Sequence, residues 1–164
     1  GGGPAGIAAA TRAAESGART VLLDDAPRPG GQIWRHRAGN AAPTDDALKA
    51  DAPPTAKRWI DRLRASGAQH FAGTTVFDLD PTGVVYAARN EEPLEIHSRR
   101  IVLATGARER FLPFPGWTLP NVMGVASVQA FAKAGASFRG KRVALSGSGP
   151  LLLPVAETLR NADA

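Results

Sequence analysis

The sequence begins with GGGPAGIAAA, and the spacing of its glycines constrains the fold more than any other feature of the chain. Gly1-x-Gly3-x-x-Gly6 fits the fingerprint of a dinucleotide-binding turn between a strand and a helix. The first glycine permits the tight bend, the second lets the backbone approach a pyrophosphate, and the third lets helix and strand pack closely. The pyrophosphate then lies at the helix N-terminus, where backbone N–H groups and the helix dipole favour an anion. A glycine-rich end can also be a flexible stub, so the pattern needs support from elsewhere in the chain.

An acidic residue follows at the distance that a ribose-binding carboxylate requires. Seventeen residues separate Gly6 from Asp24, which is room for a helix, a turn and the short strand TVLLD. This spacing places a carboxylate at the C-terminal end of the strand, where it can accept hydrogen bonds from a ribose. Asp25 is adjacent and competes for the role, and a solvated acidic turn is the alternative without a function. We predict that Asp24 is the ribose-binding residue.

Strand, glycine turn and helix occur a second time near the end of the chain. Residues 141–146 are expected to form a buried strand, and GSGP and a last helix follow. Gly147 and Gly149 keep two glycines of the fingerprint and are candidates for binding a second nucleotide. Leu152 occupies the third position, where a side chain obstructs close contact between helix and strand. A turn that only supports packing is therefore an equal alternative. Two such units predict an α/β fold with two nucleotide-binding units.

The segment between the two glycine turns changes its hydrophobic period. Three short apolar stretches with turn residues between them predict a small antiparallel β-meander: 74–80, 83–89 and 94–98. Helices are expected over 4–16, 54–67 and 125–134, a buried strand over 99–107, a proline-rich ordered linker over 108–124, and a mobile surface segment over 38–54.

The first glycine turn has no strand in front of it, and the chain has no starting methionine. A parallel sheet buries its first strand on both faces, and each lost apolar side chain would cost ~1.5–3 kcal/mol. Four or five such losses would exceed a typical net stability of about 5–15 kcal/mol. We therefore expect the sequence to be a fragment, trimmed at both ends.

Composition excludes several classes of site. The chain has no cysteine, which excludes disulfides, thiolate catalysis and cysteine-held clusters within it. The histidines, His36, His70 and His97, lack the spacing of metal ligands, so we expect no metal site. The formal charge is +5, but basic and acidic residues are mixed along the chain, so we expect no nucleic-acid partner. No apolar run approaches the ~20 residues that span a bilayer, and with no signal peptide visible we expect a cytoplasmic protein.

Three further stretches line up in order: PGGQIWR, IVLATGARER and VALSGSGPLLLPVAETLR. In this order they resemble the pyridine nucleotide-disulfide oxidoreductases, flavoproteins with two dinucleotide-binding domains, over nearly the whole chain. The resemblance implies a Rossmann-like FAD-binding domain with a small antiparallel β-meander over residues 1–120, its first strand missing. It implies the truncated beginning of a second, NAD(P)-type domain over residues 121–164. FAD is then the expected cofactor, and NAD(P) is a candidate for the second turn.

In that superfamily the first glycine loop binds FAD, the Gly-Gly loop approaches the flavin, and the strand that ends in ATG passes the FAD pyrophosphate. Val76 is expected to give backbone contacts to adenine. Carried over residue by residue, the resemblance implies that FAD is bound by Gly1, Gly3, Pro4, Ala5, Gly6, Asp24, Gly31, Gln32, Val76, Ala104, Thr105 and Gly106.

The residues after the Gly-Gly pair separate the branches of this superfamily. The glutathione reductase type carries paired cysteines there, whereas this chain has QIWR, so thiol exchange beside the flavin is excluded. The thioredoxin reductase type shares Gly-Gly-Gln and carries its cysteine pair in the second domain, so it stays an alternative. The stretch GARERFLPFPGWTLPNVMGVASVQAF looks like the FAD-binding subunits of opine oxidase, hydroxyproline and proline dehydrogenase, hydrogen cyanide synthase and the sarcosine oxidase α chain.

We therefore expect an FAD-dependent oxidoreductase that acts with partner subunits on an amine-like or amino-acid-like substrate. The alternatives are an NAD(P)H-dependent reductase of the thioredoxin reductase type and a non-catalytic, nucleotide-binding accessory subunit. Trp34 and His36 lie near the predicted flavin, either to tune it or as an ordinary buried Trp and solvated His. No residue is assigned as a catalytic acid or base, because the flavin carries the hydride chemistry while the protein supplies binding and electrostatics.

Overall fold

The computed structural model describes residues 1–35 and 53–161. Within the described residues, the chain divides into two compact units, of which the first is residues 1–34 with 53–106 and the second is residues 107–161. The units therefore change at Gly106, earlier than the predicted domain boundary at residue 120, which stays a prediction. His36 and nearly all of the predicted mobile segment lie outside the described residues.

Helix α1 (Pro4–Glu15) and strand β1 (Val21–Leu23) open the first unit, as the sequence predicts. Proline is favoured at the first helical position, because its fixed φ suits the helix and it has no N–H to leave unpaired. The helix ends before Gly17, which has a φ of +86°, a conformation that glycine adopts without strain. The buried residues of α1 include Ile7 and Ala10, so this face of the helix is directed toward the core.

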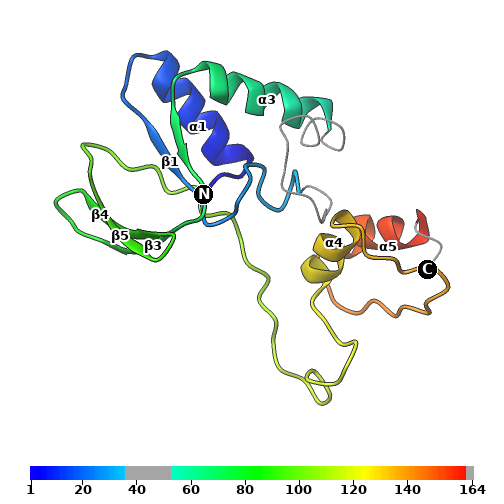
Figure 1. The fold of residues 1–164 in the computed structure, drawn as a ribbon. Helices are drawn as coiled ribbons and strands as arrows, with labels where there is room; N and C mark the ends of the chain where they lie inside the picture. Colours follow the sequence, from blue (N-terminus) through cyan, green and yellow to red (C-terminus); the bar gives the residue numbers. More distant parts are fainter. Residues whose placement is uncertain (36–52, 162–164) are drawn as a thin grey trace. The chain divides into compact units, whose positions relative to one another are not determined.

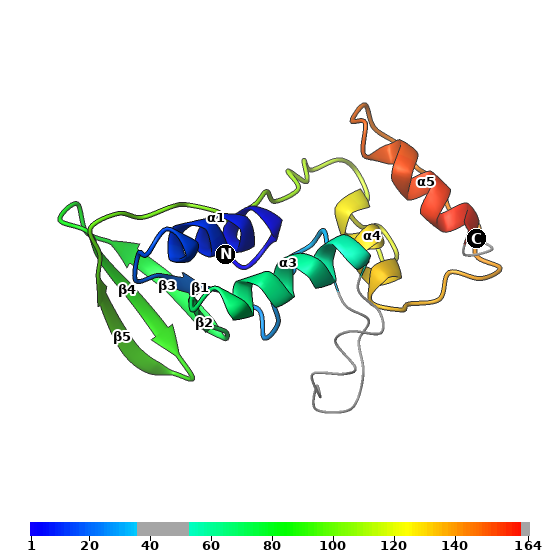
Figure 2. The same cartoon turned by 90° about the horizontal axis from the view of Figure 1, so that it is seen from above.

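Helix α3 (Pro54–Ala65) and strand β2 (Gln69–Phe71) complete the α/β part of the unit. Strands β1 and β2 pair in parallel, with Leu22 opposite His70. Figure 1 shows α1 and α3 side by side, and Figure 2 shows the pair next to β1 and β2. The core that joins them consists of Ile7, Ala10, Leu22, Ile60 and Leu63, with Trp34, Trp59 and Ala68 packed against it.

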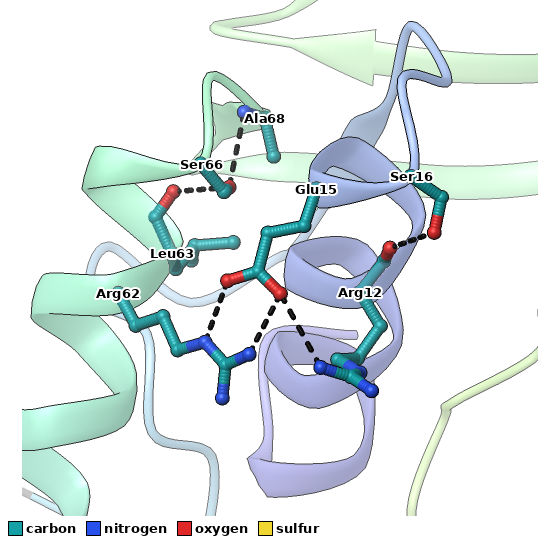
Figure 3. A network of polar contacts seen from close by, with 7 residues as sticks. All are labelled: Arg12, Glu15, Ser16, Arg62, Leu63, Ser66 and Ala68. Carbon is teal, nitrogen blue, oxygen red and sulfur yellow. Dashed lines mark hydrogen bonds and ion pairs between the residues drawn. The ribbon is translucent and has the colours of Figure 1, made fainter.

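An ion pair ties the two helices together at their solvent side. Arg62 of α3 donates from Nε and Nη2 to the two carboxylate oxygens of Glu15 on α1, at 2.6 and 2.7 Å (Figure 3). Arg12 lies on the other side of the same carboxylate, at 3.6 Å. The hydrogen bond from Arg62 lowers the pKa of Glu15 below its usual value. Both partners are partly exposed, so the pair helps to align the helices more than it adds stability.

The predicted meander is confirmed as strands β3 (Thr74–Leu79), β4 (Val84–Arg89) and β5 (Glu92–His97) in one antiparallel sheet. Asn90 and Glu91 form the turn between β4 and β5, both with a positive φ, as a two-residue hairpin turn requires. A register shift interrupts the pairing between Val76 and Asp78. The backbone N–H of Thr74 donates to the carbonyl of Asp24 at 2.8 Å. The first strand of the meander therefore begins beside the C-terminal end of β1.

The second unit contains helices α4 (Val125–Lys133) and α5 (Leu152–Asn161), both predicted from the sequence. Val128, Val155 and Leu159 form its small core, and Val125, Phe138 and Leu145 pack against that core. Glu109 caps α4, because its carboxylate accepts hydrogen bonds from the backbone N–H groups of Val125 and Ala126. Among the described residues, every helix is too short or too polar to cross a lipid bilayer.

The strands predicted over 99–107 and 141–146 are not formed. Neither range contains a strand or helix, and Val102 and Leu103 are 71% and 74% exposed. Their apolar runs are typical of buried strands, but a strand is stable only when a neighbour satisfies its backbone N–H and C=O groups. In the described part of the chain, neither segment has such a neighbour.

Candidate functional site

The glycine turn at the start of the chain leads directly into α1. The carbonyl of Gly3 accepts the backbone N–H of Ile7 at 2.9 Å, which closes the first turn of the helix. Gly3 is the N-cap, and no side chain caps the helix there. The first turn contains Pro4 and Ala5 and has no acidic residue. The positive end of the helix dipole is thus available to an anion, as a pyrophosphate site requires.

The first and third glycines of the turn are needed for close packing. A Cβ atom on Gly1 would lie 2.5 Å from the carbonyl oxygen of Ala104. A Cβ atom on Gly6 would overlap the carbonyl oxygen of Gly1 and lie 3.3 Å from Cδ1 of Leu22. The third glycine therefore allows α1 to approach both the turn and strand β1, which is the role that its place in the fingerprint predicts.

A second pair of glycines lies against the same turn. The backbone N–H of Gly30 donates to the carbonyl of Gly2 at 2.7 Å. Gly31 has a φ of +58°, and a Cβ atom there would lie 2.9 Å from the Cα of Gly3. Gln32, which follows, is exposed. The Gly-Gly loop is thereby placed beside the predicted pyrophosphate turn.

Asp24 is held at the C-terminal end of β1 by its backbone. Its N–H donates to the carbonyl of Phe71 at 3.0 Å, and its carbonyl accepts the N–H of Thr74 at 2.8 Å. Asp24 is only 6% exposed, whereas Asp25 is exposed. Its Oδ2 atom is buried and has no hydrogen-bond partner. Of the two candidate acids, Asp24 is therefore the one that lies at the glycine turn with an unsatisfied acceptor.

The remaining predicted FAD contacts divide into two groups. Ala104 and Thr105 lie against Gly1, so the ATG segment reaches the first turn although it forms no strand. Gly106, next to them, has a φ of +73°. Val76 is on β3, two residues after Thr74, and is 45% exposed. Its contact with adenine stays a prediction.

Comparison with known proteins identifies the family of the chain. The whole chain, residues 1–164, matches the family described as pyridine nucleotide-disulphide oxidoreductase. The chain belongs to this family of oxidoreductases. A solved thioredoxin reductase from Gloeobacter violaceus is 26% identical with a TM-score of 0.46, over 99% of this chain and 52% of that one.

Three curated relatives of this chain are named as subunits of enzymes. A subunit of opine oxidase from Rhizobium meliloti (strain 1021) is 38% identical over 92% of this chain and 33% of its own length. The HcnB subunit of hydrogen cyanide synthase from Pseudomonas protegens is 34% identical over 95% of this chain and 34% of its own. The alpha subunit of sarcosine oxidase from Corynebacterium sp. (strain U-96) is 29% identical over 97% and 18%. The chain thus spans about a third of the opine oxidase subunits that it matches.

FAD is the cofactor that this family implies, and the residues present fit it. The uncapped N-terminus of α1 suits a pyrophosphate. The carboxylate of Asp24 lies at the end of β1 beside the glycine turn, where it can accept hydrogen bonds from a ribose. The close packing around Gly1, Gly6 and Gly31 leaves no room for a side chain at these positions. Among the described residues, no group of three or more His, Asp or Glu side chains is arranged to hold a metal ion.

The second glycine turn of the chain belongs to the second unit. Gly147 has a φ of +145°, and a Cβ atom there would lie 3.4 Å from Cδ1 of Leu152. Nothing crowds Gly149 within 4 Å. Helix α5 begins at Leu152, which puts Pro154 in its first turn, where proline is tolerated. Binding of NAD(P) at this turn stays a prediction.

Sequence reasoning missed three residues at the first site. Gly2 and Gly30 carry the hydrogen bond that joins the two glycine loops, and both lie inside glycine runs whose other members were assigned. His70 was considered only as a metal ligand. In the structure it pairs with Leu22, and Leu22 stands two residues before Asp24 in the sequence. Its position follows from strand pairing, and the sequence alone carries no signal for it.

Proposed function

We propose that the protein is an FAD-dependent oxidoreductase and that it works as one subunit of a dehydrogenase for amines or amino acids of the opine, proline or hydroxyproline kind. The observation that carries the cofactor assignment is the position of the Asp24 carboxylate, which lies against Gly2 of the glycine turn and has no hydrogen-bond partner at Oδ2. A carboxylate at this position can accept hydrogen bonds from the ribose of a dinucleotide.

The residues of the first unit would have separate roles in holding FAD. The N-terminus of α1 and the glycines of the first turn would hold the pyrophosphate, Asp24 the ribose, and Gly31 with Gln32 would approach the flavin. When bound, FAD supplies the hydride chemistry. These residues would bind and orient the cofactor, and none of them is assigned a proton-transfer role.

The curated relatives support both the role as one subunit of an enzyme and the substrate class. The relatives from opine oxidase, hydrogen cyanide synthase and sarcosine oxidase are all named as subunits. We propose, by the same reasoning, a cytoplasmic location and partner chains that complete the enzyme. The second candidate is an NAD(P)H-dependent flavoprotein reductase, which the Gly147-x-Gly149 turn before α5 favours.

The test uses the full-length protein purified with its partner subunits. Chromatography of the heat-released cofactor should identify FAD and not FMN, because FMN has no pyrophosphate for the glycine turn to hold. Anaerobic mixing with an opine, proline, hydroxyproline or sarcosine should then bleach the flavin for one of them. A colourless protein that FAD cannot reconstitute would exclude the proposal. A flavin that only NADH or NADPH reduces would favour the second candidate.

A further inference from the structure

Two polar side-chain atoms on neighbouring strands are buried without a hydrogen-bond partner. They are Oδ2 of Asp24, after β1, and Nε2 of His70, on β2. Buried polar atoms in proteins nearly always have a partner, so an unpaired one calls for an explanation. The proposed contact with the ribose gives the carboxylate of Asp24 a role, and it leaves His70 without one.

The pairing of β1 with β2 places these side chains on one face of the sheet. Leu22 is opposite His70, so their side chains lie on the same face. Side chains alternate along a strand, so Asp24, two residues after Leu22, returns to that face. His70 and Asp24 are thus diagonal neighbours at the end of the strand pair where the glycine turn lies.

Three charged side chains from different elements influence the imidazole of His70. Asp24 follows β1, Arg64 is on α3, and Arg89 is on β4. Burial is the largest effect and lowers the pKa of His70, so the imidazole is neutral at neutral pH. The two arginines lower the pKa further, whereas Asp24 is the one group of the three that favours the charged form.

An imidazolium at this position would therefore need the Asp24 carboxylate. A buried charge without a partner is costly, and the proton that His70 takes from solvent would make both ring nitrogens donors. Asp24 is the one anionic group among those that influence the imidazole, and its Oδ2 has no hydrogen-bond partner. The same carboxylate is the one proposed to receive the ribose.

We infer that His70 is a positioning residue for the dinucleotide site. When His70 is neutral, the carboxylate of Asp24 is available to the ribose. When His70 is protonated, it pairs with that carboxylate, so the affinity for FAD falls in acid. This inference rests on the proposed binding of FAD. It adds a dependence of FAD binding on pH, which the glycine fingerprint and the spacing to Asp24 do not predict.

The test is the dissociation constant of FAD from the full-length apoprotein at several values between about pH 5 and pH 8. For the wild type we expect affinity to fall toward acid with the slope of one proton, roughly tenfold per pH unit once His70 titrates. His70→Gln should lose this slope. His97→Gln is the matched control, because His97 is exposed on β5 and should leave the slope unchanged.

A second measurement uses the wild-type protein and needs no variant. NMR titration of the imidazole should give a lower pKa for His70 in the FAD complex than in the apoprotein, since binding and protonation compete. A pH-independent affinity, tighter binding in acid, or an equal or higher pKa in the complex would overturn the inference and leave the proposed function intact. A protein that binds no FAD at any pH would overturn both.

Discussion

Gly2 lies directly against the carboxylate of Asp24, so that a Cβ atom on residue 2 would overlap Oδ2. The backbone of Asp24 is fixed at the same time by hydrogen bonds to Phe71 and Thr74. Hydrogen bonds therefore hold the backbone of the acid at the end of β1, and the glycine turn lies against its side chain. This arrangement places the carboxylate close to the N-terminus of α1, as binding of a dinucleotide requires.

Replacement of Asp24 by Asn should weaken FAD binding without destabilising the apoprotein. A hydrogen bond to a charged acceptor contributes about 1.5–3 kcal/mol, which corresponds to roughly a ten- to hundredfold loss of affinity. Stability should not fall, because Oδ2 of Asp24 has no partner within the protein. Titration of the full-length apoprotein with FAD measures the first effect, and thermal melting measures the second.

The matched control is Asp25→Asn, since Asp25 is the adjacent acid and is exposed. Its affinity for FAD should equal that of the wild type. If Asp25→Asn weakens binding and Asp24→Asn does not, the ribose role belongs to Asp25, and the orphaned oxygen of Asp24 needs another explanation.

Two alanine substitutions should separate binding from folding within one turn. A Cβ atom on Gly3 would lie 4.0 Å from Gly31, which is ordinary contact, so Gly3→Ala should leave the melting temperature of the apoprotein nearly unchanged. It should still weaken FAD binding by roughly tenfold or more, because the methyl group would occupy the place of the pyrophosphate. Gly6→Ala puts a methyl group on the carbonyl of Gly1 and should cost about 1–3 kcal/mol of stability.

Melting of both apoproteins and titration with FAD provide the comparison. Equal affinity in Gly3→Ala and wild type would mean that no pyrophosphate approaches this turn. An undiminished melting temperature in Gly6→Ala would show that α1 can move away from β1 and that the third glycine is not required for packing.

Local spacing explains which parts of this site the sequence predicts. Gly1, Gly3, Gly6 and Asp24 are fixed by one turn, one helix and one strand, so counting residues is sufficient to place them. His70 depends on the pairing of two strands that are distant in the sequence, and β2 is too short and too polar to give a strand pattern. The apolar run of 101–103 predicts burial, but it does not name the strand that would pair with it.

The ion pair between Arg62 and Glu15 should contribute to stability only above acid pH. The pKa of Glu15 is lowered by the hydrogen bond from Arg62. A carboxyl group whose pKa is lower in the folded state than in the unfolded state stabilises the fold at pH values above its unfolded pKa. This stabilisation is lost as the pH falls through the pKa of the folded state. Arg62→Gln should therefore lower the melting temperature slightly at pH 7, and the difference from wild type should disappear toward about pH 3.

Arg58→Gln on the same exposed side of α3 is the control for a change of charge alone. It should leave the pH dependence of melting as it is in the wild type. A difference between Arg62→Gln and wild type that persists unchanged in acid would assign the effect to packing of the Arg62 side chain.

The second glycine turn should bind NADH poorly, so that electrons enter from the amine-type substrate and leave through another carrier. Leu152 stands where the fingerprint has its third glycine, and its side chain lies near Gly147. A side chain at this position keeps the helix from the close approach that a nucleotide site needs. Under anaerobic conditions, micromolar NADH should leave the flavin of the full-length protein oxidised, while dithionite reduces it. Leu152→Gly restores the spacing and should speed reduction by NADH if the side chain is the obstacle. Rapid bleaching of the wild-type flavin by NADH would instead make the protein an NAD(P)H-dependent reductase, with the second turn as its entry site for electrons.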